Sequence, residues 1–428
     1  MFRMLLKIYV ILVMLASAAH ATAPQEVLRG WYGLVLELVR HTPTYSPPVA
    51  SRSFAYLGVT AFEVLATGSR ELQSLAGQLN GFTPVPQRET GQTYDEAVVV
   101  HAAMTHAAQN FFANTGPTGK RALAAMARKN VGQGVAPDVV ARSQAHGQAV
   151  AAHIVDWSRS DGGAVIENMG FPLDYALSKG PARWVPTSLV AQQQKPLLPN
   201  WGSNRTFAMP EATSCPLPAP PEYSEDMTSE FYKQALEVYQ ISQNLSAEQR
   251  AIARFWSDDP MLSPTPPGHW IAIALQILER DNASLENSVD VLARLGIGVA
   301  DGFIGCWNTK FQYDLLRPVT YIRRVIDPQW ETLLITPPFP EYPSGHSTQS
   351  AAAALVLTQF FGENFRFEDT THKRDGLESR SYPSFWAAAE EAGRSRLYGG
   401  IHFRAAIERG LEQGRCVGGY VNALRTRK

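Results

Sequence analysis

Apolar residues recur at intervals of three and four along most of this chain, which is the period of an amphipathic helix. Five such segments follow one another in the first part of the chain: QEVLRGWYGLVLELVRH, PPVASRSFAYLGVTAFEVLA, TYDEAVVVHAAMTHAAQNFFAN, GKRALAAMARKN and PDVVARSQAHGQAVAAHIVDWSRS. Consecutive helices with short connections usually pack antiparallel. The pattern therefore predicts an N-terminal helical bundle over residues 22–161.

A second helical region follows a change in composition. Residues 162–226 are rich in Pro, Gly and Ser, but they also carry many aromatic and aliphatic side chains. We therefore expect an ordered crossover packed on the bundle. Helical periodicity returns at SEFYKQALEVYQISQNLS, and no alternating strand pattern persists anywhere. The prediction is an all-α fold of two helical bundles that share one core, with the second bundle in residues 227–428.

The first 21 residues have the pattern of a secretory signal peptide. Arg3 and Lys7 precede the apolar run IYVILVMLASA, and the small residues of AHA end at Ala21. The alternative is an uncleaved N-terminal anchor. No later stretch has 18 uninterrupted apolar residues, so we expect no stable membrane insertion of the mature chain. The predicted location is secreted or, in a Gram-negative bacterium, periplasmic.

Composition changes this picture little. The chain is 45% hydrophobic and 18% charged with a formal net charge of -1, which argues against nucleic acid as a partner and leaves an oligomer possible. Its three cysteines are too few for a disulfide scaffold. Cys306 and Cys416 both lie in predicted helices and could pair. The favoured interpretation is buried free thiols.

Polar residues that could bind a ligand or take part in a reaction are concentrated in the C-terminal region. In CWNTKFQYDLLRP, Lys310 and Arg317 are seven residues apart and are predicted to share a helix face, with a Lys310–Asp314 ion pair as the alternative. In EYPSGHSTQS, Ser344 and Gly345 stand where an alanine-rich helix is expected to begin. Free main-chain N–H groups at a helix start bind anions, although a simple helix cap would use the same residues.

Two histidines complete the set. His346 follows the Ser-Gly pair, and in SRLYGGIHF the residues Arg396 and His402 flank a Gly-Gly break. Fixed cations and main-chain amides would hold the oxygens of a tetrahedral oxyanion. One imidazole would attack or ligate the central atom, and the other would handle a proton on the opposite oxygen.

These three motifs resemble the signature of the superfamily of type-2 phosphatidic acid phosphatases and vanadium haloperoxidases. The resemblance implies a vanadium chloroperoxidase-like fold and vanadate, or phosphate in the same site, as the bound anion. It implies that His402 is the axial vanadium ligand or the nucleophile, and that His346 is the acid/base. The residues that would hold the equatorial oxygens are Lys310, Arg317, Ser344, Gly345 and Arg396.

The resemblance is closest to the haloperoxidase branch. Trp307 and Phe339 are similar to its halide-site aromatic residues, with core packing as the alternative, and Asp259 in IARFWSDDP is similar to an aspartate that supports the acid/base histidine. The implied activity is oxidation of halide by hydrogen peroxide. The alternatives are a secreted acid phosphatase or phosphotransferase acting on a phosphate ester, and a non-catalytic oxyanion-binding relative.

One position departs from the signature. The superfamily carries an aspartate four residues after the second histidine, where this chain has Ala406. That carboxylate would orient the imidazole and strengthen it as a base. Its absence disfavours a phosphatase more than a haloperoxidase, because a backbone carbonyl can hold the free nitrogen of a metal-ligating histidine.

Overall fold

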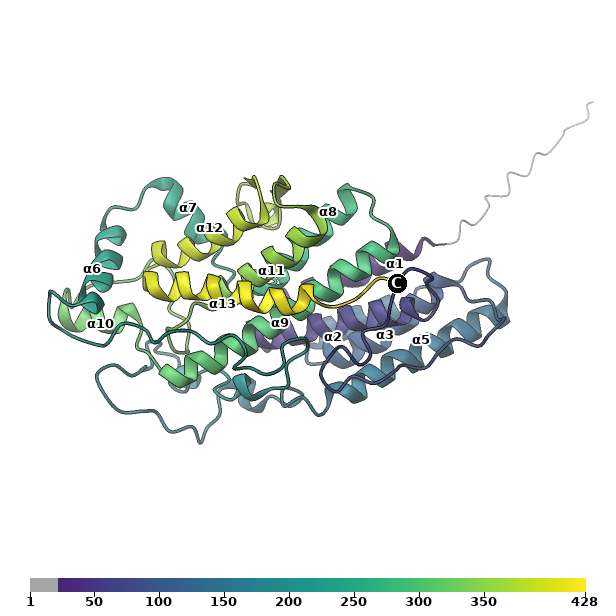
Figure 1. The fold of residues 1–428 in the computed structure, drawn as a ribbon, viewed down its shortest axis with the longest axis horizontal. Coiled ribbons are helices and arrows are strands. Elements are labelled where there is room, and N and C mark those ends of the chain that lie inside the picture. Colours follow the sequence, from purple (N-terminus) through teal and green to yellow (C-terminus); the bar gives the residue numbers. More distant parts are fainter. Residues whose placement is uncertain (1–21) are drawn as a thin grey trace, which may run out of the picture.

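The computed structural model describes residues 22–428, so the predicted signal peptide lies outside the described residues. The first five α-helices cover the predicted N-terminal bundle (Figure 1), and they are α1 Pro24–Arg40, α2 Pro47–Ala66, α3 Glu96–Phe111, α4 Pro117–Ala127 and α5 Pro137–Ser158. The helices of the C-terminal part are α6 Glu230–Gln243, α7 Ala247–Phe255, α8 Thr265–Arg280, α9 Leu285–Tyr313, α10 Pro318–Val325, α11 Gly345–Phe361, α12 Phe385–Tyr398 and α13 Arg404–Asn422. The all-α prediction is confirmed.

The described residues contain one two-stranded sheet, a short hairpin. Strands β1, Phe367–Asp369, and β2, Arg380–Tyr382, pair antiparallel with Phe367 opposite Tyr382. The 3-10 turn η4, Lys373–Asp375, lies between them. Both aromatic rings of the end pair are buried, so the hairpin adds apolar surface to the core beside α8 and α12.

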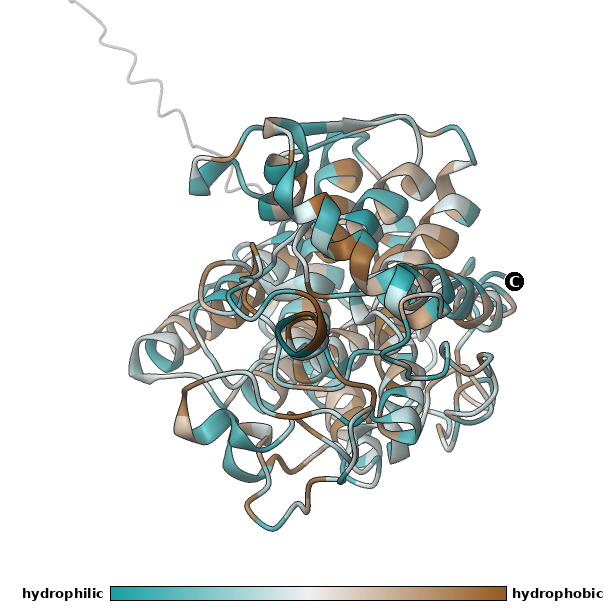
Figure 2. Cartoon of the chain, turned by 90° about the vertical axis from the view of Figure 1, so that its left-hand side faces the viewer, coloured by the Kyte–Doolittle hydropathy of each residue, from teal (hydrophilic) through white to brown (hydrophobic). Residues whose placement is uncertain are grey.

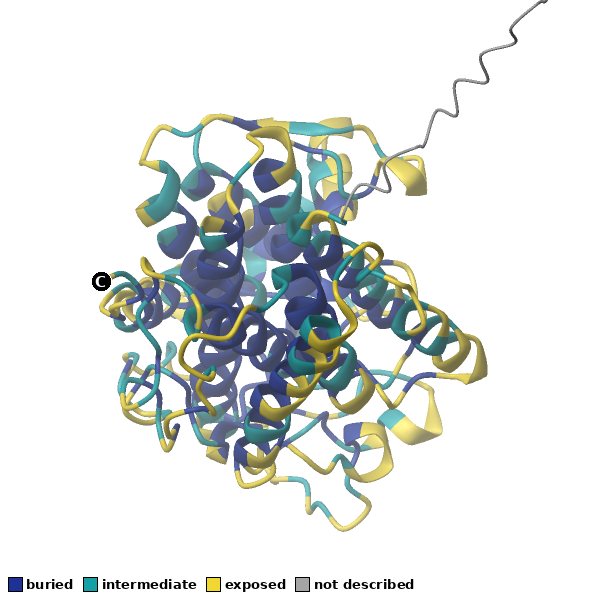
Figure 3. Cartoon of the chain, turned by 90° about the vertical axis from the view of Figure 1, so that its right-hand side faces the viewer, coloured by how far each residue is buried: buried dark blue, intermediate teal, exposed yellow. Residues whose placement is uncertain are grey.

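The two bundles share one core, as predicted. Helix α9 runs through the middle of the molecule and packs on α2 from the N-terminal bundle and on α11 from the C-terminal one. Glycines allow the close approach of α2 and α9, because a Cβ at Gly58 would lie 2.8 Å from Ala293 Cα and a Cβ at Gly296 would lie 2.9 Å from Phe54 O. Hydrophobic segments gather in the interior (Figure 2), and buried residues occupy the same region (Figure 3).

The crossover between α5 and α6 contains three 3-10 turns: η1 Glu167–Gly170, η2 Ala191–Gln194 and η3 Trp201–Ser203. Asp301 of α9 anchors it, because its buried carboxylate accepts the main-chain N–H groups of Phe207, Ala208 and Met209 at 2.6, 2.8 and 2.9 Å. Three such bonds compensate much of the cost of burying a carboxylate. The segment thereby becomes part of the wall beside α9.

The cysteine pairing differs from both alternatives drawn from the sequence. A disulfide joins Cys215 of the crossover to Cys416 of α13, and Cys306 is the buried free thiol. The Cys306–Cys416 pairing was therefore wrong, and free thiols were expected correctly only for Cys306. The physical reason is orientation, since Cys306 is enclosed in the core near Pro343 whereas Cys416 faces the crossover at Ser214.

The helix expected to carry both Lys310 and Arg317 ends between them. Asp314 has a left-handed backbone (φ 49°) and closes α9 by donating its N–H to Lys310 O at 2.8 Å. Arg317 is the N-cap of α10. The prediction of one shared helix face was wrong, because an αL residue redirects the chain. The structure also contains no Lys310–Asp314 ion pair within the described residues.

Candidate active site

The motif residues meet where α9, α10, α11 and α12 end or begin. Lys310 lies in the last turn of α9, Arg396 in the last turn of α12 and His402 in the linker before α13. His346 lies in the first turn of α11. Arg317 lies in the same cluster. Burial is the main reason that the pKa of His402 lies well below its ordinary value, and the charges of Arg317, Lys310 and Arg396 and the neighbouring His346 lower it further.

His402 is hydrogen-bonded on both sides of its ring. Its Nε2 lies 3.1 Å from Arg317 Nη1, and its Nδ1 lies 2.9 Å from Glu341 Oε1. In this chain a carboxylate, rather than a backbone carbonyl, holds the nitrogen that faces away from the cations. Sequence reasoning missed Glu341. The available signal was an acidic residue in the otherwise apolar run PPFPEYP immediately before Ser344.

Glu341 is fully enclosed. Its side-chain Oε1 also accepts the main-chain N–H of Phe403 at 2.8 Å. Burial raises the pKa of Glu341 to about 7, although the positive charges of Arg317 and Lys310 and the bond to Phe403 oppose that shift. The carboxylate therefore lies close to the cations of Arg317 and Lys310 on the His402 side.

Lys310 is more constrained than the sequence implied. Its ammonium donates to three main-chain carbonyls of the loop before α11: Pro340 at 2.9 Å, Glu341 at 3.0 Å and Pro343. Burial lowers its pKa to about 7. Lys310 therefore orders this loop, and contact with an oxyanion would require it to give up one of these bonds.

The Ser-Gly pair begins α11 as predicted. Ser344 caps the helix, since its Oγ accepts the N–H of Ser347 at 3.3 Å. Its own main-chain N–H donates to Ala406 O at 2.9 Å, so that donor is engaged within the protein. A Cβ on Gly345 would lie 3.5 Å from the Trp307 ring, in ordinary contact. Gly345 therefore brings the helix start against the aromatic wall.

Several buried polar atoms around the site have no hydrogen-bond partner within residues 22–428. They are Arg317 Nη2, Glu341 Oε2, His346 Nε2 and Ser347 Oγ. Arg317 Nη2 and the Ser347 hydroxyl can donate, and a buried donor without a partner is costly unless an acceptor such as an anion compensates it. Glu341 Oε2 and the neutral His346 Nε2 are acceptors, which can take a protonated oxygen of the same anion. The set therefore fits a multiply charged oxyanion such as vanadate or phosphate.

His346 and Arg396 both lie near the main chain of Trp256. Arg396 donates through Nη2 to Trp256 O and through Nε to Ser395 Oγ at 2.9 Å. Burial, followed by the charge of Arg396, lowers the pKa of His346 well below its ordinary value. A neutral imidazole with a free Nε2 can accept a proton at the site.

Comparison with solved structures identifies the family. The chain superposes on a bacterial vanadium-dependent iodoperoxidase with a TM-score of 0.86 and 38% sequence identity, covering 94% of this chain and 97% of that one. The chain belongs to the vanadium haloperoxidase family. A family model described as the VCPO second helical-bundle domain matches residues 324–427.

Two further relatives of this vanadium haloperoxidase are more distant. A holo-type bacterial vanadium-dependent chloroperoxidase has a TM-score of 0.69 at 16% identity, over 90% of this chain and 93% of that one, which shows the shared fold. The vanadium chloroperoxidase of Curvularia inaequalis is 29% identical over 138 residues. That match spans 26% of this chain and 23% of the Curvularia inaequalis protein.

Asp259, the predicted support of His346, lies near Arg396 in this haloperoxidase. Burial raises its pKa, while the charge of Arg396 and a hydrogen bond from Ser257 oppose the shift. No hydrogen bond between Asp259 and His346 is present among the described residues. Asp259 therefore faces the cation of Arg396, and its predicted support of His346 remains a prediction.

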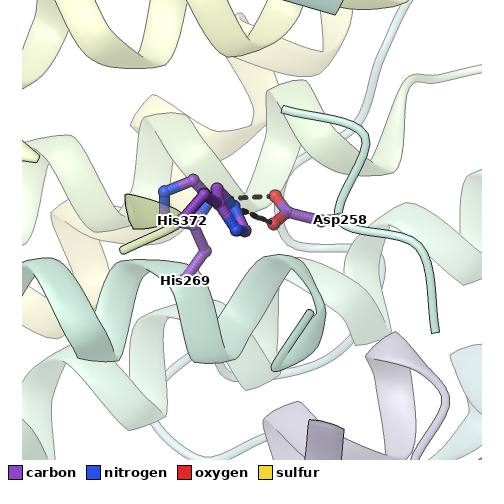
Figure 4. A group of neighbouring side chains, drawn as sticks. All are labelled: Asp258, His269 and His372. Atoms are coloured by element: carbon purple, nitrogen blue, oxygen red, sulfur yellow. Dashed lines mark hydrogen bonds and ion pairs between the residues drawn. The ribbon is translucent and has the colours of Figure 1, made fainter. Parts of the chain in front are cut away.

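The preceding residue, Asp258, belongs to a separate buried network (Figure 4). Its carboxylate lies 3.0 Å from His269 Nδ1 and 3.2 Å from His372 Nε2. Asp369 lies 2.8 Å from His269 Nε2, and Asp375 lies 3.2 Å from His372 Nδ1. Although burial opposes protonation, the two carboxylates raise the pKa of His269 to about 10.

This network contacts Trp256, the C-cap residue of α7. The Trp256 and His269 rings stack with centroids 4.5 Å apart. Asp258, His269 and His372 are also the group of described residues whose ligand atoms lie close enough to hold a metal ion. Each ring nitrogen already has a carboxylate partner, so hydrogen bonding alone accounts for the arrangement. The sequence analysis missed these histidines because Asp258 is 114 residues from His372.

The predicted aromatic residues line the cationic site. The Trp307 and Phe339 ring centroids are 4.9 Å apart, and Phe339 lies 5.2 Å from Lys310 Nζ and 5.0 Å from Arg317 Cζ. Trp307 also packs in a small apolar cluster with Phe303. The aromatic pair is therefore both a wall of the site and part of the core.

Proposed function

We propose that this chain is a vanadium-dependent haloperoxidase that uses hydrogen peroxide to oxidise a halide. The observation that carries the proposal is the neutral imidazole of His402 beside a buried excess of positive charge from Lys310, Arg317 and Arg396. Such a site binds a multiply charged oxyanion. Bound vanadate would supply the Lewis-acid centre that activates hydrogen peroxide.

The residues of the chain would bind the anion and transfer protons. The lone pair of His402 Nε2 would bind the vanadium, and Arg317 Nη2 would bind an oxygen of the anion. Arg396, Lys310 and the start of α11 at Gly345 would hold the other oxygens. His346 Nε2, which is buried and unpaired, would take or return a proton during the reaction.

Iodide is the halide we propose first. The solved relative at 38% identity is an iodoperoxidase. Iodide is also the most easily oxidised of the common halides and the most polarisable. The Trp307–Phe339 wall beside Lys310 would offer it a polarisable surface next to a positive charge.

Phosphate-ester hydrolysis is the second candidate, and Glu341 is the observation that favours it. Part of the case against a phosphatase was the absence of a carboxylate behind His402, yet Glu341 Oε1 lies 2.9 Å from its Nδ1. A histidine nucleophile supported in this way could attack a phosphate ester. A non-catalytic relative would bind the anion without turnover.

One preparation separates these functions. Metal-free protein should be assayed with orthovanadate and hydrogen peroxide against iodide, bromide and chloride, and without vanadate against p-nitrophenyl phosphate. We expect vanadate-dependent iodide oxidation. Phosphatase activity that vanadate inhibits would favour the second candidate, and tight vanadate binding without turnover would indicate the non-catalytic relative.

We also propose that the mature chain works outside the reducing cytoplasm. The Cys215–Cys416 disulfide supports this, because structural disulfides persist in oxidising compartments. The residues up to Ala21 have the signal-peptide pattern. No helix in residues 22–428 is long and apolar enough to cross a membrane. N-terminal sequencing of the exported protein should begin at Thr22.

A further inference from the structure

We propose that Glu341 is the positioning residue for His402 and replaces the signature aspartate that is Ala406 in this chain. The inference rests on the proposed function, because it assigns how the histidine that binds the anion is held. The central observation is the 2.9 Å contact between Glu341 Oε1 and His402 Nδ1, across 61 residues of sequence. Both side chains are almost completely buried.

Hydrogen bonds on both sides of the ring determine its tautomer. A guanidinium has only donors, so the 3.1 Å contact with Arg317 Nη1 requires His402 Nε2 to accept. A neutral imidazole carries one N–H, so Nδ1 holds that proton and donates it to Glu341 Oε1. The proton therefore lies on Nδ1, and the lone pair of Nε2 points toward the cations. This is the form of the ring that can ligate a metal.

Glu341 is itself held firmly enough to impose this orientation. Its Oε1 accepts the N–H of Phe403 at 2.8 Å, and its own main-chain N–H donates to Leu315 O at 2.9 Å. Its main-chain carbonyl accepts from Lys310 Nζ at 3.0 Å. Because both the backbone and the side chain of Glu341 are fixed, the position of its carboxylate sets the orientation of the imidazole.

Position 406 borders the same space. Ala406 is fully buried, and a small cavity is lined by Leu315, Glu341, Phe403 and Ala406. A carboxylate introduced by Ala406→Asp would therefore enter the region that Glu341 already occupies. His402 precedes α13, which begins at Arg404, so the four-residue spacing is not a spacing within one helix. One acidic group, contributed from either position, is sufficient to hold the ring.

The test moves the carboxylate from one position to the other. We expect Glu341→Ala to weaken orthovanadate binding by the metal-free protein about 10- to 100-fold, the range typical of residues that orient metal ligands. Glu341→Gln keeps an acceptor oxygen and should lose less. The double variant Glu341→Ala/Ala406→Asp should recover at least tenfold of the lost affinity. Binding is measured by equilibrium titration without peroxide.

A matched control excludes a general effect of changing a buried carboxylate. Glu63 of α2 is also fully buried and accepts from Leu75 N–H at 2.6 Å and Ser74 Oγ at 2.8 Å. Glu63→Gln should leave vanadate affinity within about twofold of wild type. In histidine-labelled protein, ¹⁵N NMR should show the Nδ1–H tautomer for His402 and a mixture of tautomers in Glu341→Ala, with His402→Ala assigning the signal.

Three results would overturn the proposal. They are wild-type affinity in Glu341→Ala, an Nε2–H tautomer in the wild type, and a folded double variant that binds no better than Glu341→Ala. If Glu341→Ala does not fold, Glu341→Gln is compared with wild type instead. The same two measurements, vanadate affinity and the tautomer of His402, then test the proposal. If wild-type protein fails to bind vanadate, the proposed function fails, whereas the tautomer spectrum still tests the role of Glu341.

Discussion

At the scale of single residues, the proposed function depends on His402, whose Nε2 faces Arg317 and the other cations. We predict that His402→Ala abolishes vanadate-dependent activity and lowers vanadate affinity by at least tenfold, while circular dichroism and the unfolding temperature stay close to wild type. Only an imidazole at this position can offer a nitrogen lone pair to the metal. Full peroxidase activity in this variant would exclude His402 as the ligand.

Glu63 provides a residue-scale prediction on pH. Burial raises the pKa of Glu63 to about 7 from 4.5, so the folded state keeps a proton that the unfolded state has released. Its contribution to stability is therefore complete below pH 4.5 and is lost as pH rises through about 7. The predicted loss, about 3 kcal/mol from a shift of this size, should be absent in Glu63→Gln.

Urea unfolding of both proteins between pH 4.5 and 8 measures this difference. The free energy of unfolding of wild type should fall relative to that of Glu63→Gln across this window. A constant difference between the two proteins would show that Glu63 titrates at its ordinary pKa in the folded state.

At the scale of elements, glycines on α13 decide how closely it packs on α11. A Cβ at Gly414 would lie 2.0 Å from Thr348 O, a backbone atom, whereas a Cβ at Gly419 would meet nothing within 4 Å. Gly414→Ala should therefore destabilise the protein by about 1–3 kcal/mol through overpacking. Gly419→Ala should be neutral or stabilising by up to about 1 kcal/mol, because alanine favours a helix.

Thermal unfolding of Gly414→Ala and Gly419→Ala compares the stability effects of the same substitution at two positions of α13. Because α11 begins at Gly345 and α13 follows His402, forcing these helices apart should also weaken vanadate binding in Gly414→Ala. Equal unfolding temperatures for both variants would contradict the close packing of α11 and α13.

At the scale of the whole molecule, the disulfide between Cys215 and Cys416 closes a separation of 201 residues and ties the crossover to the last helix. We predict that replacing both cysteines with serine costs about 2–5 kcal/mol. Thermal unfolding with and without reductant measures the effect. Cys306→Ala is the control, because this buried thiol is unpaired and its replacement should leave the response to reductant unchanged.

The sequence alone determined the helical architecture and the residue types of the anion site. Helical periodicity depends on neighbours three and four residues apart, so the helices of both bundles were visible in the apolar pattern. The motif residues around Ser344, Arg396 and His402 were likewise predicted from the sequence, because the family signature is a pattern of residue types and spacings along the chain. The structure brings them together around His402.

Only the tertiary structure decided which side chains of the site contact one another. The αL residue Asp314 separates Lys310 from Arg317, Glu341 reaches His402 from another loop, and Asp258 reaches His372 across 114 residues. The cysteine pairing was decided in the same way. The physical reason is that such contacts depend on how loops turn and on which helix faces meet. These are properties of the packed chain, and no local periodicity encodes them.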